Sequence, residues 1–250
     1  MRKKITILIS IFLFFLLAML PMQLMLKLAP ESVSKNIQGV EGSVWSGEIG
    51  KIVWQGNRLE SVQYSLNPLY LVTGALRLNL EFDDQLVNGD VSFDIGSDFP
   101  DTATVNDANL NLQLTSFSQY LPISGASIEG EIETRNFDLV IENKKPISGE
   151  GNISLKNIKV DYLNKKWDFG DFNWSVSTNE SGIITAELLS GKNTLQLQGS
   201  LTLDQNGIAE FNGSIATNID QTMYGALSLF NNGKLQNGRL PIKFKQKLIR

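Results

Sequence analysis

The stretch Leu76-Arg-Leu-Asn-Leu-Glu-Phe82 alternates apolar and polar side chains without interruption. Successive side chains of a strand point to opposite faces, so this pattern predicts a β-strand with one apolar and one polar face. Similar alternating runs recur along the chain, at 91–95, 110–114, 137–141, 153–155, 158–162, 172–176, 195–197, 201–203 and 242–244. The sequence therefore predicts a mainly β protein beyond residue 40.

Turn-forming sequences separate these runs at short spacing: Asn88-Gly89, Gly149, Asn206-Gly207, Asn212-Gly213, Asn232-Gly233 and Asn237-Gly238. Tight turns favour hairpins over crossover connections, and hence antiparallel pairing. We expect a long, curved antiparallel meander sheet whose apolar face lines a core or a groove. Short helical turns are predicted at 66–73 and 117–122, and the stretch 115–127 is the predicted seam between two halves.

The chain begins with a long apolar segment that follows three basic residues. Ile5 to Leu26 would form roughly 33 Å of helix, enough to cross a hydrocarbon core of about 30 Å. This predicts a single transmembrane signal anchor with the basic residues in the cytoplasm and the body outside it. The predicted organisation is a cytoplasmic N-terminus at 1–4, the anchor at 5–26, a linker at 27–39 and a periplasmic β-rich domain at 40–250.

Two other interpretations of the apolar segment stay open. It could be a cleaved signal peptide, with the cut after Ala29, but Lys27 then occupies a position where a small residue is preferred. It could also be a buried helix of a soluble domain.

Composition excludes many kinds of catalytic site. The chain has no His and no Cys, which rules out disulfides, thiol nucleophiles, imidazole or thiolate zinc sites and a Ser-His-Asp triad. No phosphate-binding Walker loop and no Gly-x-Ser-x-Gly elbow occur. All 26 acidic residues lie within 28–233, which holds 12 basic residues and has a net charge of −14. We therefore predict no enzymatic activity, no cofactor and no nucleic-acid partner, since nucleic acid requires a basic surface.

A basic stretch lies near the carboxyl end. In Leu240-Pro-Ile-Lys-Phe-Lys-Gln-Lys247, the side chains of Lys243, Lys245 and Lys247 would share one face of a strand. Such a face could contact anionic lipid or an acidic partner. Alternatively, the lysines protect the edge of a sheet from unwanted strand pairing.

A glycine-rich signature follows the apolar segment. Gly39-Val-Glu-Gly-Ser-Val-Trp-Ser-Gly47 precedes Val62-Gln-Tyr-Ser-Leu-Asn-Pro-Leu-Tyr-Leu-Val-Thr-Gly-Ala-Leu76. This layout resembles the type II secretion system protein N family, which has a Gly-x-x-Trp-x-Gly stretch after its anchor and then an aromatic-x-Leu-x-Pro segment. Tyr64 occupies the aromatic position of this segment, where Trp is common in the family. The residues that carry the resemblance are Gly39, Gly42, Trp45, Gly47, Tyr64, Pro68 and Gly74.

The resemblance implies a non-enzymatic inner-membrane component that assists export of folded proteins across the outer membrane. Its implied partners are the inner-membrane platform and the secretin, with membrane lipid contacted through the anchor. A similar Trp-Gly and Pro-Gly pattern occurs in AsmA-like proteins, which resemble long β-grooves that handle lipid. The alternative function is therefore an anchored lipid-handling groove, which would keep an apolar trough open to its ligand.

Overall fold

The computed structural model describes residues 15, 19–28, 31–54, 57–74, 76–96, 101–115, 127–162, 165–189, 192–219, 221, 224 and 234–247. The chain divides into two compact units, Met1–Ser97 and Asp98–Arg250, and each is described by itself. The seam predicted at 115–127 falls largely outside the described residues and stays a prediction.

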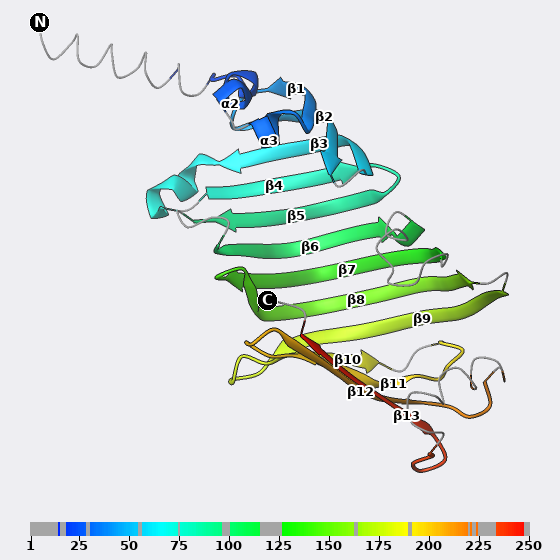
Figure 1. The fold of residues 1–250 in the computed structure, drawn as a ribbon. Coiled ribbons are helices and arrows are strands. Elements are labelled where there is room, and N and C mark those ends of the chain that lie inside the picture. Colours follow the sequence, from blue (N-terminus) through cyan, green and yellow to red (C-terminus); the bar gives the residue numbers. More distant parts are fainter. Residues whose placement is uncertain are drawn as a thin grey trace, which may run out of the picture. The chain divides into compact units, whose positions relative to one another are not determined.

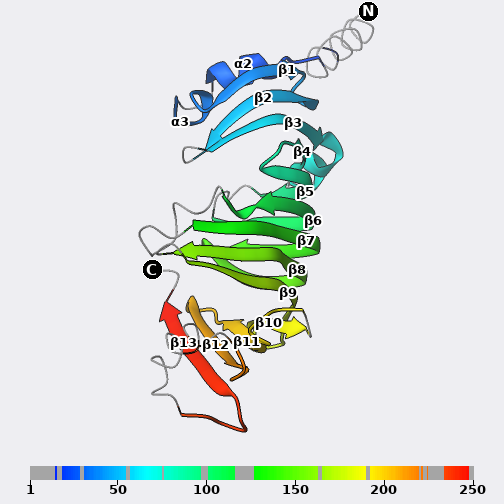
Figure 2. The ribbon, with the colours of Figure 1, turned by 90° about the vertical axis from the view of Figure 1, so that its right-hand side faces the viewer.

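Thirteen strands in the described part of the chain follow one another in the sheet in the same order as in the sequence. Each register that is defined between neighbouring strands is antiparallel. Figures 1 and 2 show this chain-order succession in each unit. The predicted antiparallel meander is thus confirmed.

In its described residues, the first unit combines five strands with short helices. Its elements are α2 (Met22–Leu28), α3 (Glu31–Ser34), β1 (Ile37–Gly42), β2 (Ser46–Trp54), β3 (Asn57–Asn67), the 3-10 helix η1 (Pro68–Thr73), β4 (Leu76–Asp83) and β5 (Val87–Ile95). The alternating run at 76–82 forms β4, and η1 confirms the helical turn predicted at 66–73. The helical turn predicted at 117–122 lies outside the described residues.

Apolar side chains from neighbouring strands form the core of the first unit. Val40, Ile49 and Val62 occupy successive register positions on β1, β2 and β3, and they are buried together with Tyr64. Burial of such aliphatic side chains contributes roughly 1.5–3 kcal/mol each. This cluster holds the first three strands in one register, because a slip by one residue would turn these side chains to the polar face.

Helix α2 packs against β1 and so contacts the first strand of the sheet. Met22 and Leu26 pack on the core cluster, and the Gln23 Nε2 atom donates a hydrogen bond to the Val40 carbonyl oxygen at 2.9 Å. A helix in this position protects an edge strand from pairing with another chain.

The predicted membrane anchor at 5–26 lies mostly outside the described residues. Its described end belongs to α2, which packs on the sheet. None of the helices in the described part of the chain has the length and apolar character needed to cross a membrane. The anchor therefore rests on the sequence alone.

The second unit contains eight strands in the described residues. They are β6 (Ala103–Gln113), β7 (Ser127–Glu142), β8 (Lys145–Tyr162), β9 (Lys165–Thr178), β10 (Ile184–Leu189), β11 (Gln198–Leu203), β12 (Ile208–Ile215) and β13 (Leu240–Lys247). Leu114, Ile158 and Phe172 are its buried cluster, with partly buried side chains such as Trp174 packed around them.

Three predicted turns lie inside strands. Asn88-Gly89 belongs to β5, Gly149 to β8 and Asn212-Gly213 to β12, whereas Asn206-Gly207 and Asn237-Gly238 do form turns. Asn232-Gly233 lies outside the described residues. At Gly213 a Cβ atom would lie 2.5 Å from the Gln198 carbonyl oxygen, so this glycine serves close backbone approach and not a turn.

The strand predicted at 195–197 is also wrong. These residues form a turn before β11, in which the Asn193 Oδ1 atom accepts a hydrogen bond from the Leu197 N–H at 2.6 Å. Gln196 has a left-handed φ of 48° and its N–H binds the Asn193 carbonyl oxygen. A local hydrogen bond from an Asn side chain has displaced the ladder that alternation alone would favour.

Bulges interrupt the long ladders between β6 and β9. The register shifts near Asp107, Asn136 and Asn157, and each of these residues has a left-handed φ between 45° and 53°. Their backbone N–H groups donate to side-chain oxygens of a neighbouring strand, which are Asp138 Oδ1, Asn109 Oδ1 and Asp171 Oδ1 respectively, at 2.8–2.9 Å. Asx side chains thus satisfy the N–H groups that the bulges release from the ladder.

We expect Gly151→Ala to destabilise the second unit. Gly151 has a φ of 127°, and its Cβ atom would lie 2.5 Å from the Asn136 carbonyl oxygen of the facing bulge. Strain of this kind costs about 1–3 kcal/mol. Chemical denaturation should show the loss, and Gly96→Ala is the control because open space surrounds that position. Equal stability of the two variants would contradict the close approach.

Candidate functional site

Polar side chains on strands β1 to β5 form rows that cross the strands. Glu41, Glu48, Gln63, Glu81 and Asp90 occupy successive directly opposed register positions, one on each strand, and all five are exposed. We call this set the acidic row. Two like-charged pairs therefore face each other directly across neighbouring strands, an arrangement that destabilises a sheet.

A second row lies two residues away on the same face. Ser46, Ser65, Asn79 and Ser92 are directly opposed on β2 to β5, and we call them the hydroxyl row. The Asn79 Nδ2 atom donates to Ser65 Oγ at 3.1 Å, and Ser92 Oγ donates to Asn79 Oδ1 at 2.8 Å. These bonds fix the amide orientation of Asn79, so this row is ordered before any partner arrives.

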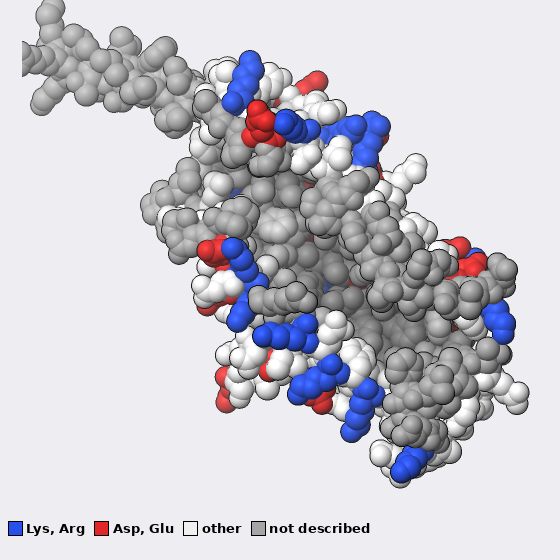
Figure 3. All heavy atoms as spheres, in the orientation of Figure 1, with Lys and Arg blue, Asp and Glu red and all other residues white. Residues whose placement is uncertain are grey.

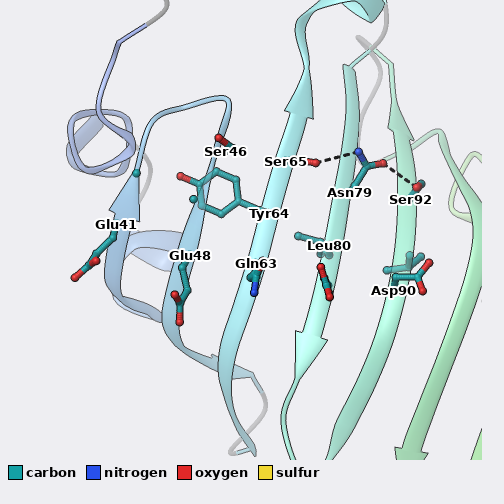
Figure 4. A pocket seen from close by; sticks show the side chains of 14 residues that line it. Glu41, Ser46, Glu48, Gln63, Tyr64, Ser65, Asn79, Leu80, Asp90 and Ser92 are labelled. Atoms are coloured by element: carbon teal, nitrogen blue, oxygen red, sulfur yellow. Dashed lines mark hydrogen bonds between the residues drawn. The ribbon is translucent and has the colours of Figure 1, made fainter.

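The two rows line a hollow of about 770 Å³. Figure 4 shows Ser65, Asn79 and Ser92 linked by hydrogen bonds, with Gln63 on the same strand as Ser65 and Glu48 on the neighbouring strand β2. Hydroxyl and amide groups can both donate and accept, whereas the carboxylates only accept. The hollow therefore suits a ligand or partner surface rich in donors and positive charge.

An ion pair ends the polar face beyond the hydroxyl row. Arg77 on β4 and Asp94 on β5 are directly opposed, with Nε to Oδ1 at 2.6 Å and Nη2 to Oδ2 at 2.5 Å. The guanidinium lies 4.4 Å from the centroid of the Tyr70 ring on η1. This two-pronged pair and the ring contact order Arg77 and tie η1 to the sheet.

The signature residues meet around the turn that joins β1 to β2. Ser43 Oγ accepts hydrogen bonds from the N–H groups of Trp45 and Ser46, each at 3.2 Å. The Trp45 carbonyl oxygen accepts from the Leu66 N–H at 2.7 Å, which joins the turn to β3. The Trp45 side chain is partly buried.

Tyr64 holds this turn from β3. Its hydroxyl donates a hydrogen bond of 2.6 Å to the Ser43 carbonyl oxygen, and only 5% of the residue is exposed. Burial raises the pKa of the Tyr64 hydroxyl above its ordinary value. The hydroxyl therefore stays protonated and able to donate throughout the physiological pH range.

Gly47 makes room for the Tyr64 contact, and Gly42 allows the close approach of β1 and β2 beside it. A Cβ atom on Gly47 would lie 2.0 Å from the Glu41 carbonyl oxygen and 2.7 Å from the Tyr64 hydroxyl. Gly42 has a φ of 102°, and its Cβ atom would lie 2.5 Å from the Ser46 carbonyl oxygen. Larger residues at either position would separate the two strands at this point.

The remaining predicted residues lie apart from the turn. Gly39 is in β1 beside Gly50, Pro68 begins η1, and Gly74 follows it with a left-handed φ of 78°. Lys243, Lys245 and Lys247 belong to the other unit, where they are exposed on β13. The structure thus brings Gly42, Trp45, Gly47 and Tyr64 together and leaves the other predicted residues elsewhere.

The polar rows were not recognised from the sequence. Alternation predicts one polar face for each strand, but it does not say which polar residues of neighbouring strands lie opposite one another. Correct register, which places Glu48 opposite Glu41 and Gln63, was the missing signal.

The arrangement of these residues suits binding. No group of His, Cys, Asp or Glu in the described ranges is arranged to hold a metal ion. The acidic row offers two carboxylates on each side of Gln63, on strands spaced about 4.8 Å apart. A partner with basic side chains at comparable spacing could satisfy them and relieve their mutual repulsion.

We expect Tyr64→Phe to lower the free energy of unfolding by about 0.5–1.5 kcal/mol, because the bond to the Ser43 carbonyl oxygen is lost. Because the folded pKa of Tyr64 is raised, its contribution is present below the ordinary tyrosine pKa of about 10 and is lost as pH rises through the folded value. Alkaline unfolding should therefore be less steep in the variant. Tyr70→Phe, in η1, is the control and should keep the steeper loss.

We expect Glu48→Gln to raise the free energy of unfolding by about 0.2–1 kcal/mol, because it removes repulsion from the directly opposed Glu41. Thermal unfolding at low and high salt should show a gain that shrinks as salt increases. Glu60→Gln is the matched control, since Glu60 faces Lys51 and this change removes an attraction. A destabilised Glu48→Gln protein would contradict the proposed repulsion.

Comparison with known proteins supplies the family. The family model for type II secretion system (T2SS), protein N matches residues 35–243. Type II secretion system protein N of Aeromonas hydrophila is 24% identical over 259 residues, covering 99% of this chain and 100% of that protein. No solved structure matches the chain significantly. Because the family match begins before β1 and extends into β13, the chain belongs to the type II secretion system protein N family.

Proposed function

We propose that this protein is a non-enzymatic, inner-membrane component of the type II secretion system that assists export of folded proteins across the outer membrane. The observation that carries the proposal is the family match, which includes both structural units. A binding role is favoured over catalysis because the ordered polar surface contains carboxylates, amides and hydroxyls without His or Cys.

The proposed location rests on the amino-terminal sequence. Residues 5–26 would anchor the chain in the inner membrane, with 1–4 in the cytoplasm and the body in the periplasm. Met22 and Leu26, at the carboxyl end of this segment, pack on the core cluster, so that end would lie outside the hydrocarbon core and lead directly into the first strands. The β-rich body would then begin close to the membrane surface.

The proposed partners are other components of the same machine, namely the inner-membrane platform and the secretin. The acidic row in the first unit offers a surface for a basic partner. The mutual repulsion within this row favours a role in binding, because a partner's positive charges would relieve it.

A lipid-handling groove is a second candidate function. Apolar side chains on one face of β7 to β9 pack around the buried cluster of the second unit yet keep part of their surface exposed, among them Ile132, Leu155 and Trp174. A single layer of sheet leaves such a face accessible to acyl chains wherever no other part of the chain covers it.

Deletion of the gene in its host separates the two candidates. We expect the deletion strain to accumulate secretion substrates in the periplasm while its outer membrane stays intact, and the wild-type gene to restore secretion. Proteomics of the culture medium and sensitivity to large antibiotics are the measurements. Normal secretion together with a leaky outer membrane would overturn the secretion role and favour lipid handling.

A further inference from the structure

Strand β13 is the last strand in the sheet order of the second unit. It pairs along its full length with β12, from Leu240 opposite Ile215 to Lys247 opposite Ile208. No strand in the described part of the chain pairs with its other edge. Backbone N–H and C=O groups on a free edge are a template for another strand.

The start of β13 is firmly held, so its edge is presented in a defined position. Leu240 and Ile215 are fully buried opposite each other. The Arg239 side chain donates from Nε to Ser214 Oγ at 2.8 Å and from Nη2 to the Ser214 carbonyl oxygen at 3.1 Å. A strand fixed in this way loses little further entropy when a partner pairs with it.

One face of β13 is basic. Lys243, Lys245 and Lys247 are exposed at alternate positions, about 6.8 Å apart along the strand. Lys245 lies opposite Glu210 of β12, and its Nζ atom forms an ion pair with Glu210 Oε2 at 3.2 Å. This pair is an example of how a lysine on β13 binds a carboxylate on an adjacent strand. Lys and Arg side chains gather over this part of the surface in Figure 3.

The other face of β13 is apolar and ends in an incompletely covered aromatic ring. Phe244 stacks on Phe211 of β12 with ring centroids 5.5 Å apart, and Phe211 contacts Trp174 edge-on at 6.5 Å. Phe244 nevertheless remains 52% exposed. An added strand could continue this aromatic succession with one apolar side chain opposite Phe244.

We propose that the edge of β13 that no described strand occupies binds an extended segment of a partner protein in which acidic residues alternate with apolar ones. The partner strand would pair through its backbone, place carboxylates beside the three lysines and place an aliphatic or aromatic side chain against Phe244. This inference does not depend on the secretion role. Lysine protection alone accounts less well for the edge, because it gives no role to Phe244, which stays 52% exposed beside the lysines.

The charges and the alternation select this occupant. A second copy of β13 would place lysines against lysines, which repel one another across a strand pair. An anionic lipid surface would attract the lysines but would leave the backbone groups of the edge unpaired. An acidic and apolar strand satisfies the lysines, Phe244 and the backbone together.

Binding of a synthetic peptide to the full chain tests the proposal. The probe is a fluorescent peptide that alternates Glu with Val and one central Phe, compared by anisotropy with a peptide of equal composition whose Glu residues are contiguous. We expect the alternating peptide to bind more tightly. We also expect the double variant Lys243→Glu, Lys247→Glu to weaken binding about tenfold or more and to prefer a peptide with Lys in place of Glu.

The matched control is the double variant Lys144→Glu, Lys192→Glu, which reverses two exposed lysines of the same unit outside β13. It should bind the alternating peptide as the unchanged protein does. Thermal unfolding of the Lys243→Glu, Lys247→Glu variant should match that of the unchanged protein, since both positions are exposed. The control variant should unfold at a slightly lower temperature, because it breaks the exposed ion pair between Lys144 and Asp101. An equal loss of binding in both variants would overturn the assignment to β13.

Backbone methylation of the peptide tests strand pairing itself. Alternate N–H groups of a strand point to opposite edges, so two peptides methylated at odd or at even positions should differ. We expect one to lose binding and the other to retain it. Equal binding by both peptides would mean that β13 binds through its charge alone, as it would bind an anionic lipid surface, and would overturn strand pairing. Failure of the unmodified alternating peptide to bind would also overturn the proposal.

Discussion

Within each unit, each described strand of this protein pairs with the strands that precede and follow it in the sequence. A backbone N–H group that leaves the hydrogen-bond ladder at a bulge therefore needs another acceptor on the neighbouring strand. The bulges between β6 and β9 show how this is done. The N–H groups of Asp107, Asn136 and Asn157 turn away from the ladder in left-handed conformations and bind Asx side chains of a neighbouring strand. These N–H groups lie near solvent, so each Asx oxygen contributes about 0.5–1.5 kcal/mol, the net value of a typical hydrogen bond.

The same requirement explains the glycine signature of the first unit. The turn between β1 and β2 uses Ser43 as its local acceptor, and Tyr64 reaches from β3 to bind the carbonyl oxygen of that residue. The contact fits only because Gly47 has no side chain. A motif first noticed as a family resemblance thus has a physical role: it fixes the register of three strands from one end.

Alternation predicted the fold class because each strand has one buried and one exposed face. It placed β4 closely, since Leu76 to Phe82 alternates without interruption. It failed at 195–197, where the Asn193 side chain accepts a hydrogen bond that forms a local turn. The turn chemistry of Asn212-Gly213 also failed, because Gly213 lies within a strand and allows close backbone approach. The turn at 195–197 depends on a specific side-chain hydrogen bond, and the approach at Gly213 depends on a residue of the neighbouring strand. A two-residue period of hydrophobicity contains neither kind of information.

To predict the polar rows, the register between strands must be known as well as the alternation within each strand. That Glu48 faces Glu41, and that Ser65 faces both Ser46 and Asn79, depends on turn lengths and bulges that sequence reasoning did not resolve. For the predicted site residues too, some positions followed from local spacing and others depended on strand pairing. Local spacing put Gly42, Trp45 and Gly47 on one turn, while the approach of Tyr64 to that turn depended on the pairing of β2 with β3.

The distribution of charge connects the fold to a binding role. The pairs Glu41–Glu48 and Glu81–Asp90 place like charges directly opposite each other, which lowers the stability of the sheet. Elsewhere the same chain does place opposite charges face to face, as at Arg77 and Asp94 or Lys245 and Glu210. Since favourable pairing is available to this fold, the repulsion within the acidic row supports the proposed binding role, in which a partner's cations would offset it.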